Sequence, residues 1–188
     1  VQVMEEVSGT DLNQFRLWYS QAGTPELKIN SIYDDKENKF TLLIEQDCKE
    51  TPNQKNKEPF YIPLRLGLLN HKGEQLPLIT ESGEKDSDPL YDRIYPITKS
   101  RQEIVFHNID SKPIPSLLRN FSAPVKLEYL YTQEELYFLM VHDSDGFNRW
   151  SAGQSLASQV ITSLQSGESN KIDEASAVIC KAFRLILN

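Results

Sequence analysis

The sequence predicts a β-sandwich of the immunoglobulin type, with a helix before it and further helices after it. Two observations support this fold: the positions of the prolines and the spacing of the apolar residues. All ten prolines of the 188 residues lie between Pro25 and Pro124, and proline breaks helix interiors but is tolerated in turns, bulges and edge strands. Apolar residues alternate with polar ones inside this region and recur at helical spacing outside it. We therefore divide the chain into residues 1–24, 25–131 and 132–188.

The N-terminal part, residues 1–24, is expected to be helical. Its apolar side chains recur on one helix face at Leu12, Phe15, Trp18 and Tyr19. Thr10 or Asp11 provides an N-cap, and Gly23 provides a stop before the first proline. A separate helical piece over residues 1–7 precedes this helix.

The middle part, residues 25–131, is expected to hold about seven short strands. The alternating segments are 26–29, 40–44, 61–69, 75–79, 92–97, 103–106 and 125–131. A turn at 70–73 closes one hairpin, and two long polar loops lie at 46–59 and 81–90. Short strands separated by regular turn signals predict an immunoglobulin-like sandwich. The Cys–Trp–Cys signature of antibody domains is missing, because no Trp occurs in this part.

The C-terminal part, residues 132–188, returns to helical spacing. Thr132-Gln-Glu-Glu135 is a capping box that opens a helix ending near His142, although the apolar run inside it also fits a strand. A break at 143–146 separates this helix from a second one that ends near Leu164. A third helix is expected from Asn170 onward. Three helices are too few to bury their apolar stripes, so we expect the beginning of a larger helical array.

Charge and hydropathy exclude several classes of function. With 20 basic and 27 acidic residues, the net charge is −7, which argues against nucleic-acid binding as the main role. No run of 18 apolar residues is present, so we expect no membrane-spanning helix. No secretory signal is visible, and the distant Cys48 and Cys180 suit a reducing compartment better than a disulfide framework. We therefore expect a cytoplasmic protein.

The three histidines do not suggest a metal site. None of His71, His107 and His142 stands at a spacing that metal ligands use. We expect His71 at a hairpin tip, His107 in a strand and His142 at a helix C-terminus, where a positive charge suits the helix dipole. A hydrolase built on His142 and Asp143 stays open as an alternative.

The other polar motifs are expected to be structural. Residues 143–146 match only the first positions of a calcium loop, and residues 34–38 form an acidic turn. Cys48 and Cys180 lack a neighbouring histidine or basic cluster and are expected to be inert. Asn120 fits a glycosylation sequon, but no secretion signal accompanies it. Since no serine-hydrolase or phosphate-loop motif occurs either, we predict no catalytic, cofactor-binding or metal-binding residue in this chain.

Three segments resemble bacterial aminopeptidase N, in the same order along the chain. Residues 11–25 (DLNQFRLWYSQAGTP) resemble the end of that family's thermolysin-like catalytic domain. Residues 113–129 (PIPSLLRNFSAPVKLEY) resemble the end of its small β-sandwich domain, and residues 142–154 (HDSDGFNRWSAGQ) resemble the opening of its C-terminal helical domain. The resemblance covers essentially the whole chain. It implies an internal fragment that holds the last helix of the catalytic domain, the sandwich and the first helices of the C-terminal domain.

The resemblance also implies a parent enzyme, a zinc metallopeptidase that releases N-terminal amino acids from peptides. Its zinc motif, its substrate-amine loop and its transition-state tyrosine would all lie upstream of Val1. We therefore expect this fragment to be non-catalytic and to bind no zinc by itself. In the parent, residues 25–131 would act as a spacer that contacts the catalytic and helical domains and positions the helical lid.

One alternative and one consequence remain. The alternative is a stand-alone immunoglobulin-like module that binds a protein or peptide through the loops at 46–59 and 81–90. The consequence concerns apolar side chains that lose their neighbours in a fragment, and these are Phe15, Trp18, Tyr19, Trp150 and Phe183. Large apolar patches are rare on monomers, so we expect these side chains to re-pack internally or to mediate self-association.

Overall fold

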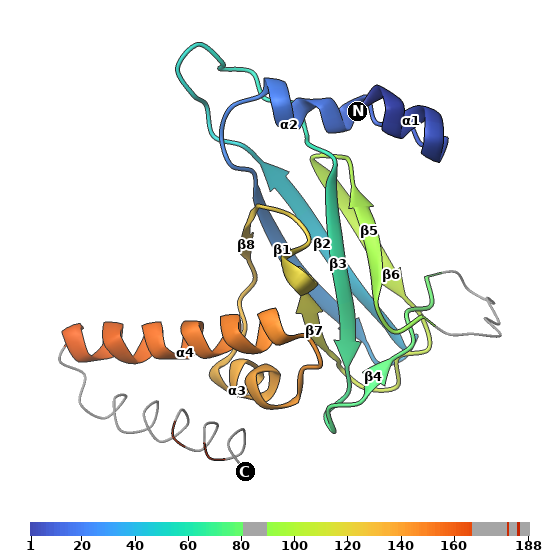
Figure 1. Cartoon of the computed structure of the whole chain (residues 1–188). Coiled ribbons are helices and arrows are strands. Elements are labelled where there is room, and N and C mark those ends of the chain that lie inside the picture. The colour runs from blue at the N-terminus through green and yellow to red at the C-terminus, as the bar shows by residue number, and fades with distance from the viewer. Residues whose placement is uncertain (81–89, 167–179, 181–183, 185–188) are drawn as a thin grey trace.

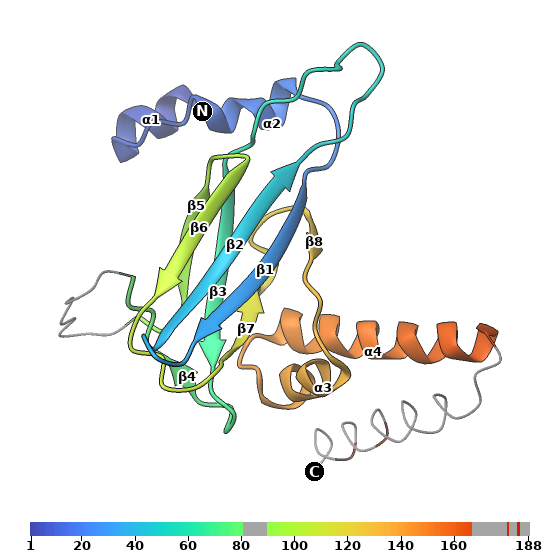
Figure 2. The same cartoon turned by 180° about the vertical axis from the view of Figure 1, so that it is seen from behind.

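The structure is a computed structural model, and it describes residues 1–80, 90–166, 180 and 184. Short helices lie at one end of a β-sandwich and two longer helices at the other (Figures 1 and 2). The helical elements are α1 (Gln2–Ser8), η1 (Gln14–Arg16), α2 (Leu17–Ser20), η2 (Arg119–Phe121), α3 (Gln133–His142) and α4 (Gly146–Ser166). The strands are β1 (Glu26–Asp34), β2 (Lys39–Asp47), β3 (Ile62–Leu69), β4 (Gln75–Leu76), β5 (Arg93–Ile97), β6 (Arg101–Phe106), β7 (Ile114–Leu117) and β8 (Lys126–Glu128). The predicted fold class is confirmed.

The first sheet has the strand order β6-β2-β1-β8. The hairpin of β1 and β2 closes at the pair Asp34 and Lys39, and Asn38 adopts the positive φ that a tight turn needs. Alternate side chains of β2 point into the sandwich, so Phe40, Leu42 and Ile44 are fully buried. The strand β8 pairs with β1 in parallel, which brings the C-terminal end of the sandwich beside its first strand.

The second sheet is built around β3, which pairs with β4, β5 and β7 in antiparallel register. Leu66 is opposite both Arg93 of β5 and Leu117 of β7, so those two strands flank β3. Ile62, Leu64, Leu66 and Leu68 of β3 are completely buried and form one core with the inner face of the first sheet. The sandwich therefore has its own hydrophobic core.

The strand β7 was not predicted from the sequence. Pro113 precedes it and Pro115 lies inside it, and a pair of prolines two residues apart usually indicates a turn. The structure resolves the conflict because β7 pairs only with β3 among the described strands, and edge strands tolerate proline. The predicted strands at 75–79 and 125–131 are correct in place but too long, since β4 and β8 have two and three residues.

The helical ends agree with the sequence in part. The capping box at Thr132 is present, with the side chains of Thr132 and Glu135 each accepting the other's backbone N–H, and the alternative of a strand after it is wrong. The single helix predicted around Trp18 is instead a 3-10 turn followed by the four-residue α2. The predicted third C-terminal helix lies outside the described residues except for Cys180 and Arg184. Within the described ranges, no helix combines the length and apolar character needed to cross a membrane.

Candidate functional site at the junction of sandwich and helices

The sandwich and the C-terminal helices share a hydrophobic cluster. Leu69 at the end of β3 is fully buried and packs with side chains of α3 and α4, which are Leu136, Leu139, Met140, Ala152 and Leu156. The link between the two parts is also held down, since the Tyr131 hydroxyl donates to the carbonyl of Pro115 at 2.7 Å. The helices are therefore packed onto the sandwich through side chains, and the covalent link is only one part of the connection.

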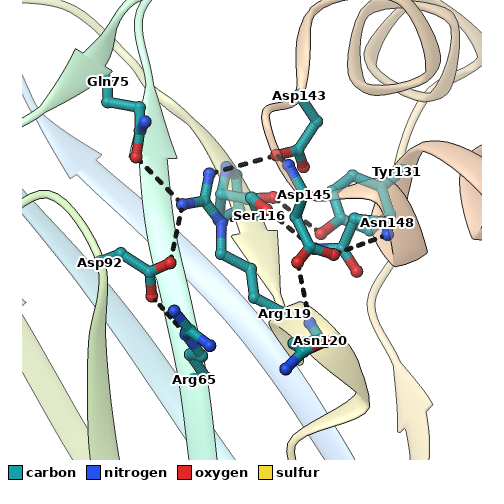
Figure 3. A network of polar contacts seen from close by, with 11 residues as sticks. Arg65, Gln75, Asp92, Ser116, Arg119, Asn120, Tyr131, Asp143, Asp145 and Asn148 are labelled. Atoms are coloured by element: carbon teal, nitrogen blue, oxygen red, sulfur yellow. Dashed lines mark hydrogen bonds and ion pairs between the residues drawn. The ribbon is translucent and has the colours of Figure 1, made fainter.

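Arg119 is a buried charged residue at the centre of this junction. Its side chain is only 1% exposed. The backbone around it adopts the left-handed conformation at Leu118, Asn120 and Phe121, with φ of 57°, 54° and 48°. This conformation costs about 1–2 kcal/mol for each residue that carries a Cβ. The strained backbone directs the Arg119 side chain inward, between β3 and the helices (Figure 3).

Gly67 on β3 leaves the space that the guanidinium occupies. A Cβ placed on Gly67 would lie 2.5 Å from Cζ of Arg119 and 2.6 Å from its Nη1. Such a short separation is far inside van der Waals contact. The β3 strand therefore needs glycine at this position while Arg119 stays in place.

Each nitrogen of the guanidinium has a polar partner (Figure 3). Nε donates to Ser116 Oγ at 2.7 Å, and Nη1 donates to Gln75 Oε1 at 3.0 Å. Nη1 also lies 3.5 Å from Asp92 Oδ2, and Nη2 donates to Asp143 Oδ1 at 3.2 Å. Ser116, Gln75 and Asp92 belong to the sandwich, whereas Asp143 follows α3. Arg119 thus connects the two parts by a buried ion pair.

Asp143 depends on this pairing. Its side chain is completely buried, and its Oδ2 atom lacks a hydrogen-bond partner among the described residues. Removing one partner of a buried ion pair costs about 3–5 kcal/mol, because the remaining charge is left without compensation. Arg119 and Asp143 are therefore expected to act as one unit.

The turn between α3 and α4 is hydrogen-bonded to the same part of the sandwich, next to Arg119. Asp145 accepts the backbone N–H of Asn148 at 2.9 Å, which caps the start of α4. The other carboxylate oxygen of Asp145 accepts the backbone N–H of Asn120 at 2.9 Å, and Asn148 Nδ2 donates to Ser116 Oγ at 2.8 Å. The cap of α4 is consequently also a contact with the sandwich. We call Ser116, Arg119, Asp143, Asp145 and Asn148 the junction cluster.

The histidines do not join this cluster. His71 is exposed in the turn between β3 and β4, and His107 follows β6 instead of lying inside a strand, with its N–H donating to Ile79. His142 ends α3 and its ring lies 4.7 Å from that of Phe138. Asp143 is engaged by Arg119 and by the amide of Asp145. This engagement argues against the hydrolase alternative of His142 and Asp143.

The acidic motifs and the buried thiol have structural roles. Residues 143–146 form the turn that caps α4, and Asp34 accepts the backbone N–H groups of Lys36 and Glu37. No group of three or more His, Cys, Asp or Glu side chains suited to a metal ion occurs among the residues that the structure describes. Burial raises the pKa of the Cys48 thiol, as expected for an inert cysteine, and Cys180 is exposed.

A cavity of about 270 Å³ lies beside the junction cluster, between the sandwich and the two helices. Leu117, Phe121, Leu136 and Phe147 contribute to its mainly apolar wall, and Tyr131 and Asn148 add polar atoms. The lining includes no Asp, Glu, His, Lys, Arg or Cys side chain, and its hydroxyl groups belong to Tyr129, Tyr131, Ser151 and Ser155. None of these hydroxyl groups has an Asp, Glu, His or Lys side chain beside it in the lining that could act as its base.

Sequence reasoning singled out Asp143 but missed Arg119 and its other partners. Gln75, Asp92 and Asp143 are separated from Arg119 by tens of residues, so no local spacing connects them. A single arginine after the apolar pair Leu117 and Leu118 was the one available signal. It did not indicate burial, because arginine side chains are mostly exposed in folded proteins.

Comparisons with known proteins agree with this architecture. Residues 23–130 match the family described as "Domain of unknown function (DUF3458) Ig-like fold", and residues 133–188 match "Domain of unknown function (DUF3458_C) ARM repeats". The chain is 40% identical to aminopeptidase N of Escherichia coli (strain K12) over 161 residues, which is 86% of this chain. It is 39% identical to aminopeptidase N of Haemophilus influenzae over 192 residues, which is 100% of this chain.

A solved structure shows the same relationship. The crystal structure of Legionella pneumophila aminopeptidase A in complex with aspartic acid matches 89% of this chain with a TM-score of 0.72 and 30% identity. The chain spans 18% and 21% of the length of the two relatives above and 17% of this solved chain. The chain belongs to the aminopeptidase N family, of which it holds the immunoglobulin-like sandwich and the helices that adjoin it.

Proposed function

We propose that this chain is the non-catalytic positioning part of an aminopeptidase N. In this proposal, residues 1–24 end the catalytic domain, residues 25–131 are the sandwich, and residues 132–188 begin the helical domain. The parent enzyme is a cytoplasmic, zinc-dependent peptidase that releases N-terminal amino acids from peptides. The support for the parent activity is that the relatives are aminopeptidases.

The buried ion pair of Arg119 and Asp143 is the observation that carries the positioning role. A flexible linker would allow many orientations of the helices relative to the sandwich. Here, two directional hydrogen bonds join the two parts: Arg119 donates to Asp143, and Asn148 donates to Ser116. A helical domain that is held at a fixed angle acts as a lid, which excludes water from the active site and limits the size of substrates that enter.

We assign zinc and all bond breaking to parts of the parent enzyme outside this chain. The donor set needed for a catalytic zinc, three His or carboxylate ligands around an open position, does not fit the described residues, where no such group of side chains converges. We therefore propose that no residue of this chain takes part in a chemical step of peptide hydrolysis. Its contribution is to hold the lid.

The alternative of a stand-alone binding module receives little support from the loop at 46–59. Gln54 and Lys57 donate to the backbone carbonyls of Ser20 and Ala22 at 2.8 Å, so this loop is partly used to hold the N-terminal segment. Trp18 packs on Phe60 with the ring centroids 4.7 Å apart.

Tyr19 and Trp150 are 77% and 60% exposed. We propose that the missing domains cover these two side chains in the parent, and that they mediate self-association in the isolated chain.

Two measurements test the proposal. First, purified 1–188 is expected to bind no stoichiometric zinc and to hydrolyse no amino-acyl anilide. Hydrolysis that persists after trace-protease controls would refute the non-catalytic assignment.

Second, the full-length parent carrying Arg119→Ala is expected to keep its turnover of small amino-acyl anilides while its discrimination against long peptides changes. The control is Arg101→Ala, which removes an exposed arginine that pairs with Glu45 on the sandwich surface. A folded Arg119→Ala enzyme that loses turnover of the small anilides would contradict a purely positioning role.

A further inference from the structure

The polypeptide before the first strand consists of two pieces that are held in different ways. We call residues 11–24 the clasp. Its helix α2 lies across the end of the sandwich opposite to α3 and α4 (Figures 1 and 2). Gln14 Nε2 donates to the carbonyls of Pro59 and Thr98 at 2.8 and 2.7 Å, and Trp18 Nε1 donates to the carbonyl of Tyr61 at 2.8 Å. These bonds fix the first half of the clasp to the ends of two strands.

The second half of the clasp is fixed as firmly. Gln21 and Glu58 exchange two hydrogen bonds of 2.9 Å between the Gln21 amide and the Glu58 backbone. Gln54 receives the backbone N–H of Ala22 at 2.7 Å. Gly23 has a φ of 103°, and a Cβ there would lie 2.8 Å from Sγ of Cys48. The clasp is therefore expected to move together with the sandwich. Gly23 is closely packed against Cys48 and does not act as a flexible linker.

The helix α1 is held much more weakly. None of its residues is buried, and Val3, Met4 and Val7 are 59–84% exposed. Among the described residues, both hydrogen bonds between α1 and the clasp involve Glu5. Its Oε2 pairs with Arg16 Nη2 at 2.6 Å, and its Oε1 accepts the N–H of Leu12 at 2.9 Å.

Gly9 and Thr10 connect the two pieces. Gly9 ends α1 with φ 66° and ψ 10°, in the left-handed conformation that glycine adopts without steric cost. A Cβ on Gly9 would meet no atom within 4 Å, so no neighbouring side chain restrains it. Rotation about Gly9 moves α1 as a rigid rod. Among the contacts that the structure describes, this rotation is opposed by the two hydrogen bonds of Glu5 and by a longer one, 3.2 Å, from the Thr10 N–H to Ser8 Oγ.

We propose that α1 is a latched arm that pivots at Gly9, with Glu5 as the latch. In the parent enzyme, this places the flexible joint at Gly9, inside the segment 1–24 that resembles the end of the catalytic domain, and not at residues 23–25, where that segment meets the sandwich. The use of the joint rests on the proposed positioning function. The flexibility of the joint is measured on this chain alone, without any enzymatic assay. A failure of the joint proposal can therefore be distinguished from a failure of the proposed positioning function.

Pulsed EPR distances between spin labels test the latch. Labels at Gln2→Cys and Lys28→Cys report α1 against the sandwich, and labels at Tyr19→Cys and Lys28→Cys report the clasp against the sandwich. Cys180→Ser removes the exposed native thiol. Each pair is measured with Glu5→Ala and with the matched control Glu6→Ala, whose carboxylate contacts only Gln2 within α1 among the described side chains.

The expected result separates the two pieces. Glu5→Ala raises the ratio of displaced to latched α1 about fivefold, the size expected for an exposed ion pair with a charge-assisted hydrogen bond. Glu6→Ala leaves the α1 distances unchanged, and the clasp distances stay narrow in every variant. An α1 distribution that stays narrow after Glu5→Ala overturns the latch. A clasp distribution that broadens together with that of α1 overturns the position of the joint.

Discussion

The close approach of Gly67 to Arg119 leads to a prediction about the stability of the junction. The change Gly67→Ala adds one methyl group to β3. That methyl group would lie 2.5–2.8 Å from three atoms of the guanidinium, so the Arg119 side chain has to move. Its displacement separates it from Asp143, which is completely buried.

The expected magnitude follows from opposing contributions. Breaking the buried pair costs about 3–5 kcal/mol. Alanine is better than glycine inside a strand by about 0.5–1 kcal/mol, which offsets part of this cost. Gly67→Ala is therefore expected to lower the free energy of unfolding by about 2–4 kcal/mol. Arg119→Ala alone is expected to cost about 3–5 kcal/mol for the same reason.

The decisive comparison is the double variant. Once Arg119→Ala has removed the guanidinium, the methyl group of Gly67→Ala has space, and its effect becomes neutral or stabilising by up to about 1 kcal/mol. Gly153→Ala in α4 is the control, because its added Cβ would meet Met140 at an ordinary 3.5 Å and it improves helix propensity by about 1 kcal/mol. Urea unfolding followed by tryptophan fluorescence and circular dichroism measures all four variants. Equal costs of Gly67→Ala with and without Arg119 would refute the reasoning.

Two further predictions concern titratable groups. Burial, the largest cause, raises the pKa of Tyr131 well above 10; the folded chain then keeps a proton that the unfolded chain releases near pH 10, so stability falls as pH rises beyond that value. Tyr131→Phe is expected to reduce this alkaline loss in urea unfolding at pH 9–11, and an unchanged slope would contradict the assignment. Burial also raises the pKa of the Cys48 thiol, so a disulfide reagent at pH 8 is expected to modify Cys180 rapidly and Cys48 only on unfolding; two rapidly reacting thiols in the native chain would show that Cys48 is accessible.

The sandwich was predictable from the sequence because its signals are local. The alternation of Phe40, Leu42 and Ile44 indicates a strand without knowledge of its partners, and the capping box at Thr132 indicates a helix start in four residues. The strand β7 was not predicted, because its pairing with β3 outweighs the local tendency of Pro113 and Pro115 to form a turn. Tertiary pairing of this kind leaves no mark on the segment itself.

The junction cluster was not predictable, for a related reason. Arg119 receives its partners from β4, from the residue before β5 and from the residue after α3, and these segments meet only in the folded chain. Asp143 was noticed because it stands next to His142, but its neighbour in space is Arg119. A short sequence distance suggested a catalytic pair, whereas the buried charge required a partner from the other side of the junction.

The chemistry of the junction cluster favours a fixed orientation over maximal stability. An apolar interface alone, such as the cluster of Leu69 with the apolar side chains of α3 and α4, tolerates rearrangement when total volume is kept. A buried ion pair is often no more stable than apolar residues of equal size, but it is strongly destabilised when either partner shifts. The backbone at Leu118 and Asn120 is strained, which opposes folding, and this conformation aims Arg119 at Asp143. A junction that sacrifices stability for direction is the kind that a lid-positioning role requires.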